Sequence, residues 1–297
     1  MSMLLASIGS YIKTAFSLLW IKAPAGTINH VVTTAARNDT LYVASNSGLG
    51  ASTTYLSTDG ISWSTTLGKT NGFRGLFWDS TFGKFYAGEG TGGRISTTVD
   101  GVSWSVAVVG SARWNGFARN TSRLVAVGNS RTVATSTNGT SWTAAVLPIS
   151  VVDVFSVIWD QTRSSFFIAG TNSFLHSADG ITWINAGTTT GIRRSVAANS
   201  SIIVQVGDSG AIYTSTTGTD SGSWVQQVSG TSASLYSVIW TGSQFIAVGD
   251  SGTLISSSDG VTWARETSNT TNNLRALVQG PSRIVALGSS ELVYANL

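Results

Sequence analysis

The side chains that could carry out acid–base chemistry are few in this sequence. Among 297 residues there are three glutamates, Glu89, Glu266 and Glu291, and no cysteine. Hydrolysis of a glycosidic bond needs two carboxyl groups about 5 to 10 Å apart, and no spacing in the chain suggests such a pair. The lack of cysteine excludes disulfides, zinc–thiolate sites and a cysteine nucleophile. We therefore expect a protein that is not an enzyme, with no catalytic residue, no cofactor and no metal site.

Binding is the better expectation, because arginine, aromatic and acidic residues recur along the chain about forty residues apart. The 17 basic residues are scattered and the net charge is only +3, so nucleic acid is not an expected partner. Alignment of the recurring segments places two sets of side chains on one face, where they would suit a peptide, a protein loop or a glycan. Ordinary turns and strand starts would use the same residue types. The predicted ligand-binding ring consists of His30, Arg74, Asn115, Phe155, Arg194, Tyr236 and Arg275 at strand starts, with Glu89, Asp208 and Asp250 in turns.

The elements that must position these residues come from a repeat. Five segments share the pattern of Ser57-Thr-Asp-Gly-Ile-Ser-Trp63, and a sixth, from Ser215 to Trp224, carries three extra residues. Asp-Gly between alternating strands predicts a tight hairpin turn, because Gly and Asp or Asn accept positive φ at low cost. The carboxylate can accept amides of its own turn, and the following Trp can wedge between sheets. The predicted structural residues are Asp59, Asp100, Asn138, Asp179 and Asp259, with Trp20, Trp63, Trp104, Trp142, Trp183, Trp224 and Trp263.

The two ends of the chain complete the count of repeats. Each period contains four short apolar segments, and the last period stops after three. Trp20 lies 43 residues before Trp63, in step with the repeat, so its segment should supply the missing outer strand and close the ring. The sequence predicts an all-β fold, a seven-bladed β-propeller of four-stranded blades closed by an N-terminal strand.

These repeats resemble those of Asp-box (BNR-type) propellers, a group that includes sialidases, sortilin-type receptors and photosystem II assembly factors. The period from Tyr236 to Glu266 is most similar to the assembly factors, although one residue fewer separates Asp and Trp than in the usual Asp-box. A sialidase-like glycosidase would imply three arginines on a carboxylate, a Tyr–Glu nucleophile pair and an acidic proton donor. The scarcity of glutamate and the lack of a Phe-Arg-Ile-Pro signature argue against that activity.

The segment before the repeats has apolar residues at helical spacing. Residues 3 to about 17 are predicted to form a short amphipathic helix, and residues 1–15 a docking segment ahead of a propeller over 16–297. So short a helix must bury its apolar face. That face could pack on the propeller or on another protein, or less readily on a membrane, since only Lys13 is basic. The predicted docking residues are Leu4, Ile8, Ile12 and Phe16.

Two functional classes fit these features. A composition rich in Ser, Thr and Gly, without cysteine or a recognisable secretion signal, favours a bacteriophage virion appendage of the tail or capsid. It would be made in the host cytoplasm, bind other virion components through its helix, and present the propeller to a host receptor or glycan. The first alternative is an assembly factor, cytoplasmic or exported, like those of photosystem II. The second alternative is a sialidase-like glycosidase. No transmembrane segment is expected, because no stretch reaches eighteen apolar residues.

Overall fold

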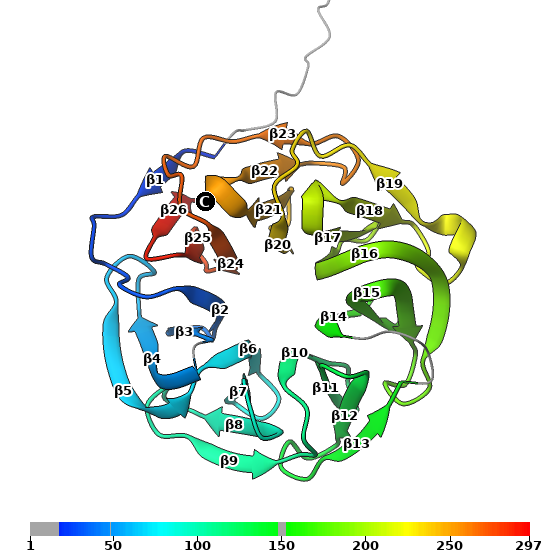
Figure 1. Ribbon diagram of the computed structural model, residues 1–297, viewed down its shortest axis with the longest axis horizontal. Coiled ribbons are helices and arrows are strands. Elements are labelled where there is room, and N and C mark those ends of the chain that lie inside the picture. The colour runs from blue at the N-terminus through cyan, green and yellow to red at the C-terminus, as the bar shows by residue number, and fades with distance from the viewer. Residues whose placement is uncertain (1–17, 48, 148–152) are drawn as a thin grey trace, which may run out of the picture.

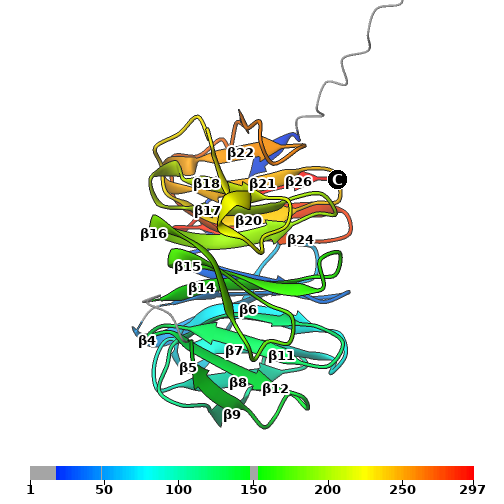
Figure 2. The same cartoon turned by 90° about the vertical axis from the view of Figure 1, so that its right-hand side faces the viewer.

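The computed structural model describes residues 18–47, 49–147 and 153–297. Antiparallel β-sheets stand around a central channel and form a β-propeller (Figure 1), seen from the side in Figure 2. The second strand of each unit is buried along its length, as in the apolar run Leu124–Gly128. Such runs are buried on both faces because neighbouring sheets pack against each side of them.

Five of the sheets have four strands each. The first of these sheets contains β2 (Val32–Arg37), β3 (Tyr42–Asn46), β4 (Leu49–Ser57) and β5 (Ser64–Asn71). The second contains β6 (Phe73–Asp79), β7 (Lys84–Glu89), β8 (Arg94–Thr98) and β9 (Ser105–Val108), and the third β10 (Trp114–Arg119), β11 (Leu124–Gly128), β12 (Thr132–Ser136) and β13 (Thr143–Val146). The others are β20 (Leu235–Trp240), β21 (Phe245–Gly249), β22 (Leu254–Ser257) and β23 (Ala264–Arg265), and β24 (Leu274–Gln279), β25 (Arg283–Gly288) and β26 (Leu292–Asn296) with β1 (Trp20–Lys22).

The remaining sheet has six strands, so the prediction of seven four-stranded blades is wrong and the described chain forms a six-bladed ring. Its long strand β15 pairs with β14 through its first half and with β16 through its second half, and β16 continues into pairing with β17. Two predicted units, those of Trp183 and Trp224, therefore share one sheet. Its strands are β14 (Val154–Asp160), β15 (Ser165–Ser177), β16 (Ile184–Ala198), β17 (Ile203–Gly207), β18 (Ile212–Ser215) and β19 (Val225–Gln227).

A buried arginine holds the long strand β16 in place. Arg193 is only 1% exposed and stands where the other inner strands have an apolar residue. Its Nη2 donates to Thr189 Oγ1 at 2.7 Å and to the Thr190 carbonyl oxygen at 2.8 Å. Its guanidinium carbon lies 4.3 Å from the ring centre of Tyr213. These contacts tie the middle of β16 to β18, while the pairing of β15 with β16 joins the two units.

The only helices among the described residues are three single-turn 3₁₀ helices: η1 (Asp208–Gly210), η2 (Ser221–Ser223) and η3 (Asp250–Gly252). The predicted N-terminal helix, with Leu4, Ile8, Ile12 and Phe16, lies outside the described residues, and within these the fold is corrected to an all-β ring. In the part of the chain that the structure describes, no helix is long and apolar enough to cross a membrane.

Strand β1 closes the ring, as the repeat count predicts. Trp20 pairs with Ala295 and Lys22 with Val293 in an antiparallel ladder. The Trp20 side chain is 2% exposed and lies in an apolar cluster contributed by the last two sheets. Lys22 Nζ lies 2.9 Å from Glu291, which also accepts a hydrogen bond from Thr270. Burial raises the pKa of Glu291, but these hydrogen bonds and the lysine charge hold it below its ordinary value.

The repeated turns are held by their own side chains. Asp59 Oδ1 accepts the amides of Ile61 and Ser62, each at 2.8 Å, while Ser57 Oγ accepts the Gly60 amide at 2.8 Å. Gly60 has a φ of 75°, the left-handed conformation that Gly adopts most easily. Equivalent bonds recur at Asp100, Asn138, Asp179 and Asp259.

The tryptophans after these turns pack within and between sheets. The Trp142 ring lies 6.2 Å from Tyr86 of the neighbouring sheet and 6.3 Å from Phe117 of its own. Trp224 stacks on Phe174 with ring centres 4.2 Å apart. Large aromatic side chains in these places remove much apolar surface from water at the rim of the ring.

Neighbouring sheets approach each other most closely at their inner strands. Thr34 Oγ1 accepts the Leu76 amide of the neighbouring inner strand at 2.9 Å. In the same way, Ser195 Oγ accepts an amide of β20 and Ser237 Oγ accepts an amide of β24. A Cβ atom on Gly75 would collide with the carbonyl group of Asn115. Only small side chains fit at this position. We call these residues the small-residue belt: Thr34, Gly75, Gly116, Ser156, Ser195, Ser237 and Ala276.

Truncation of the closing tryptophan tests the ring closure. Trp20→Ala should lower the free energy of unfolding by about 3 to 5 kcal/mol, because a large aromatic is removed from a packed cluster. Urea unfolding measures the effect, and Leu19→Ala is the matched control, since Leu19 is 78% exposed on the same segment. Equal stability of the Trp20→Ala protein and the parent would contradict the closure.

Acidification tests the turn carboxylates. Burial raises the pKa of Asp59, but the amide and Ser57 hydrogen bonds outweigh it and lower the pKa from 3.8 to about 2. The folded state binds the proton more weakly, so stability from the ionised group is present above about pH 4 and is lost as the pH falls to about 2. Asp59→Asn keeps the acceptor oxygen, as Asn138 does, and should lose less stability over that interval. Thermal unfolding at a series of pH values measures this, and identical profiles would refute it.

Candidate functional site: the channel mouth

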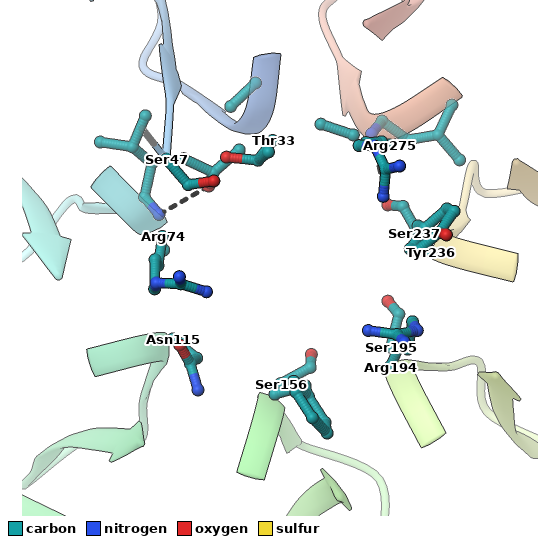
Figure 3. A pocket seen from close by; sticks show the side chains of 18 of the residues that line it. Thr33, Ser47, Arg74, Asn115, Ser156, Arg194, Ser195, Tyr236, Ser237 and Arg275 are labelled. Carbon is teal, nitrogen blue, oxygen red and sulfur yellow. Dashed lines mark hydrogen bonds between the residues drawn. The ribbon is translucent and has the colours of Figure 1, made fainter. Parts of the chain in front are cut away.

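One residue bulges out of the ladder at the same place in every inner strand that the structure describes. The pairing skips from Val32 to Thr34 in β2 and from Phe73 to Gly75 in β6, and the same shift recurs in β10, β14, β16, β20 and β24. A bulge redirects the side chain of the extra residue. Figure 3 shows several of these side chains around the central opening. We call them the ring residues: Thr33, Arg74, Asn115, Phe155, Arg194, Tyr236 and Arg275.

The ring residues surround a cavity of about 420 Å³ at one end of the channel, which we call the channel mouth. The small-residue belt lies directly below them, and Ser47 joins the lining from the β3–β4 connection. This volume lies within the range of small-ligand sites, and the strands that carry the ring residues are fixed on both sides.

One side of the mouth is a stack of alternating cations and rings. The Arg194 guanidinium carbon lies 5.5 Å from the Phe155 ring centre and 5.1 Å from the Tyr236 ring centre. The Arg275 guanidinium carbon also lies near Tyr236, 4.2 Å from its ring centre. Arg194 also forms a two-pronged ion pair with Asp208, with 3.0 Å from Nη2 to Oδ2. The Tyr236 hydroxyl donates to Asp250 at 3.0 Å, and Arg275 lies 4.0 Å from that carboxylate. The charges on this side are therefore largely balanced.

The other side is held differently. Asn115 Nδ2 donates to Asn129 Oδ1 and to the Val154 carbonyl oxygen, both at 2.7 Å. Arg74 has no hydrogen bond or ion pair within residues 18–47, 49–147 and 153–297, and its Nε is buried without a partner. Burial lowers the pKa of Arg74, the nearby Arg113 charge lowers it further, and Asp153 acts in the opposite direction.

The structure brings together six of the seven strand-start residues of the predicted ring, from Arg74 to Arg275. His30 is the exception, since it precedes β2 and its Nδ1 lies 2.8 Å from the Tyr55 hydroxyl. Thr33 takes its place at the mouth. The signal for Thr33 is its position directly after the buried Val32, as Arg74 follows Phe73.

The predicted turn residues divide in the same way. Asp208 and Asp250 begin 3₁₀ turns and pair with ring residues. Glu89 is 3% exposed within β7 and accepts a hydrogen bond from Ser96 at 2.6 Å, so it does not line the mouth. Its pairing with Phe73 aligns it with Gly207 rather than Asp208. Among the described residues, no three His, Asp or Glu side chains gather as metal ligands would.

Comparison with known proteins supports the propeller fold. A family model described as the DUF6242 beta propeller domain matches residues 185–296. No curated protein matches the sequence. The structure of streptogramin B lyase superposes with a TM-score of 0.80 at 9% identity, over 95% of this chain and 98% of that one.

Two further solved structures share the fold. A chain of the mitotic checkpoint complex has a TM-score of 0.73 at 12% identity, covering 100% of this chain and 97% of its own. YCF48 from Cyanidioschyzon merolae has a TM-score of 0.71 at 15% identity, covering 93% and 98%. Identities this low establish the architecture alone, because one fold carries many functions.

Neutralisation of the mouth carboxylates tests whether their pairs shape the site or stabilise the fold. Arg194 and Asp208 are 28% and 30% exposed, and partly exposed ion pairs contribute little to stability. Asp208→Asn and Asp250→Asn should each change the free energy of unfolding by no more than about 1 kcal/mol. Urea unfolding measures this. A loss of several kcal/mol in either variant would show that the pairs hold the ring together.

Proposed function

We propose that this propeller is a non-catalytic binding module whose channel mouth binds a carbohydrate. The observation that carries the proposal is the ring of bulged side chains, which places arginines, aromatic rings and hydroxyl groups around one open cavity. A β-propeller domain by itself suggests a binding or structural role. The composition of the mouth supports the more specific assignment.

A sugar presents hydroxyl groups along its edges and an apolar face, so it needs hydrogen-bonding side chains beside aromatic surface. Tyr236 and Phe155 supply aromatic rings, held in place by Arg194 between them. Thr33, Ser47 and the belt serines supply hydroxyl groups around the same cavity. Because the side chains project from strands and not from long loops, they keep their geometry before a ligand arrives.

The same contacts argue against glycoside hydrolysis. A general acid must bring a carboxyl group within hydrogen-bond reach of the leaving oxygen. Asp208 and Asp250, the carboxylates beside the mouth, are each within ion-pair distance of an arginine. Both carboxylates are therefore already engaged by side chains of the protein, which supports a binding role over hydrolysis.

For the biological setting, we propose a bacteriophage virion appendage that presents this mouth to a host glycan. A composition rich in Ser, Thr and Gly, with only 10% charged residues, supports this setting. An assembly factor is the second candidate, favoured by the similarity of the Asp-box-like repeats to those of photosystem II assembly factors. Mass spectrometry of co-purifying proteins separates them: virion components support the first, and subunits of a membrane complex support the second.

A glycan array tests the proposed function. Labelled protein should bind a subset of bacterial surface polysaccharides, and Tyr236→Ala and Arg194→Ala should weaken that binding about tenfold or more, since each removes a side chain central to the stack. Arg265→Ala is the matched control, because it removes the same charge from the exposed outer strand β23. Absence of glycan binding by the parent, or equal binding by all variants, would refute the proposal.

A further inference from the structure

The three arginines of the ring are not equivalent. Arg194 is bound by Asp208, and Arg275 lies 4.0 Å from Asp250. Arg74, across the opening from Arg275 in Figure 3, has no such partner among the described residues. Two of the three cations therefore have an ion pair within the protein, and the third has none among the described residues.

The sequence shows why Arg74 is unpaired. In two other units, the second strand ends in a glycine and an aspartate follows it: Asp208 follows Gly207 of β17, and Asp250 follows Gly249 of β21. Phe73 pairs with Glu89 at the matching register, so the residue that corresponds to these aspartates is Gly90. A Cβ atom at Gly90 would lie 3.6 Å from Arg74 Nε, the place where a carboxylate would otherwise stand. Gly90 places no side chain there, so this turn supplies no carboxylate to Arg74.

The surroundings of Arg74 favour an anion there. The charge of Arg113 acts on Arg74 from the next sheet, and no ion pair balances Arg113 in the part of the chain that the structure describes. Asp153 is the carboxylate whose charge acts on Arg74, but it forms no ion pair with Arg74 among the described residues and accepts the Ser130 amide at 3.1 Å. Ser47 lines the cavity on the same side as Arg74 and adds a hydroxyl donor. A guanidinium group in such a place binds carboxylate, sulfate or phosphate through charge-assisted hydrogen bonds.

We propose that Arg74 binds a single anionic group of the ligand on the side of the channel mouth where Gly90 replaces the aspartate of other units. The inference rests on the proposed function, in that the group is carried by a sugar. The ligand is then an acidic saccharide with one carboxylate or sulfate on Arg74, while its uncharged part faces the Tyr236 side of the mouth. One cation, and not a cluster of three arginines, recognises the charge.

The sharpest test restores the missing carboxylate. Gly90→Asp should pair with Arg74 and weaken anion binding at least about tenfold, whereas Gly90→Asn, of equal size and without charge, should retain it. Gly90 has ordinary backbone geometry, and an added Cβ would make only normal van der Waals contacts, 3.6 Å from Arg74 Nε and from the Gly72 carbonyl oxygen, so both variants should fold. Binding is followed by NMR through the Nε–Hε signal of Arg74, identified by its loss in Arg74→Lys.

Three probes separate the sources of the charge. Glucuronate and glucose 6-sulfate should shift the Arg74 signal in a saturable way, and glucose at equal concentration should not. Whichever of the two acidic sugars binds with the lower dissociation constant identifies carboxylate or sulfate as the preferred group. The Nε–Hε signal of Arg194 should shift less, because that guanidinium group is already hydrogen-bonded to Asp208.

The inference is overturned if neither acidic sugar shifts the Arg74 signal, or if Gly90→Asp and Gly90→Asn weaken binding equally. Retained binding of neutral glycans on the array would then leave the proposed function standing without the anion site. Saturable binding of both acidic sugars at Arg74, with no glycan bound on the array, would instead support the anion site and refute the broader function.

Discussion

The close approach of neighbouring inner strands is the constraint on which the rest of the molecule depends. At the small-residue belt a hydroxyl of one strand accepts an amide of the next, as Thr34 does for Leu76, or a glycine lets two backbones meet. These contacts bring the inner ends of the sheets together and leave a narrow channel. The bulge lies one residue away, so the ring residues inherit their positions from this packing.

Much of the fold could be predicted from the sequence because each repeat contains residues that mark its turns. Asp-Gly turns followed by Trp mark the outer hairpins, and the step from Trp20 to Trp63 indicates the closing strand. The number of sheets could not be obtained in this way. Residues 184–198 contain Thr, Ile and Gly without proline, so the chain crosses from one unit to the next as a strand. The contacts of Arg193 with Thr189 and Thr190, which hold this crossing, involve packing that no local pattern reveals.

The sequence predicted which residues line the candidate site better than it predicted which of them form ion pairs. Charged and aromatic residues at repeat spacing indicated most of the ring, since one strand position recurs in every unit. His30 lies three residues before Thr33, so the first unit was aligned out of register, whereas Glu89 was misplaced by a single residue. Which arginine is balanced depends on whether aspartate or glycine follows the second strand. That comparison requires the observed register, because a shift of one residue exchanges Glu89 for Gly90.

The recurrence of the bulge also bears on how such a protein can change over time. Each ring residue projects from an irregularity that the strands around it maintain, so its identity contributes little to the folding of its own sheet. Thr33, Arg74 and Phe155 occupy equivalent places although they share neither size nor charge. Selection can therefore replace one ring side chain at a time and alter the preference of the mouth without disturbing the scaffold. A library randomised at these bulges would sample new specificities on an unchanged framework.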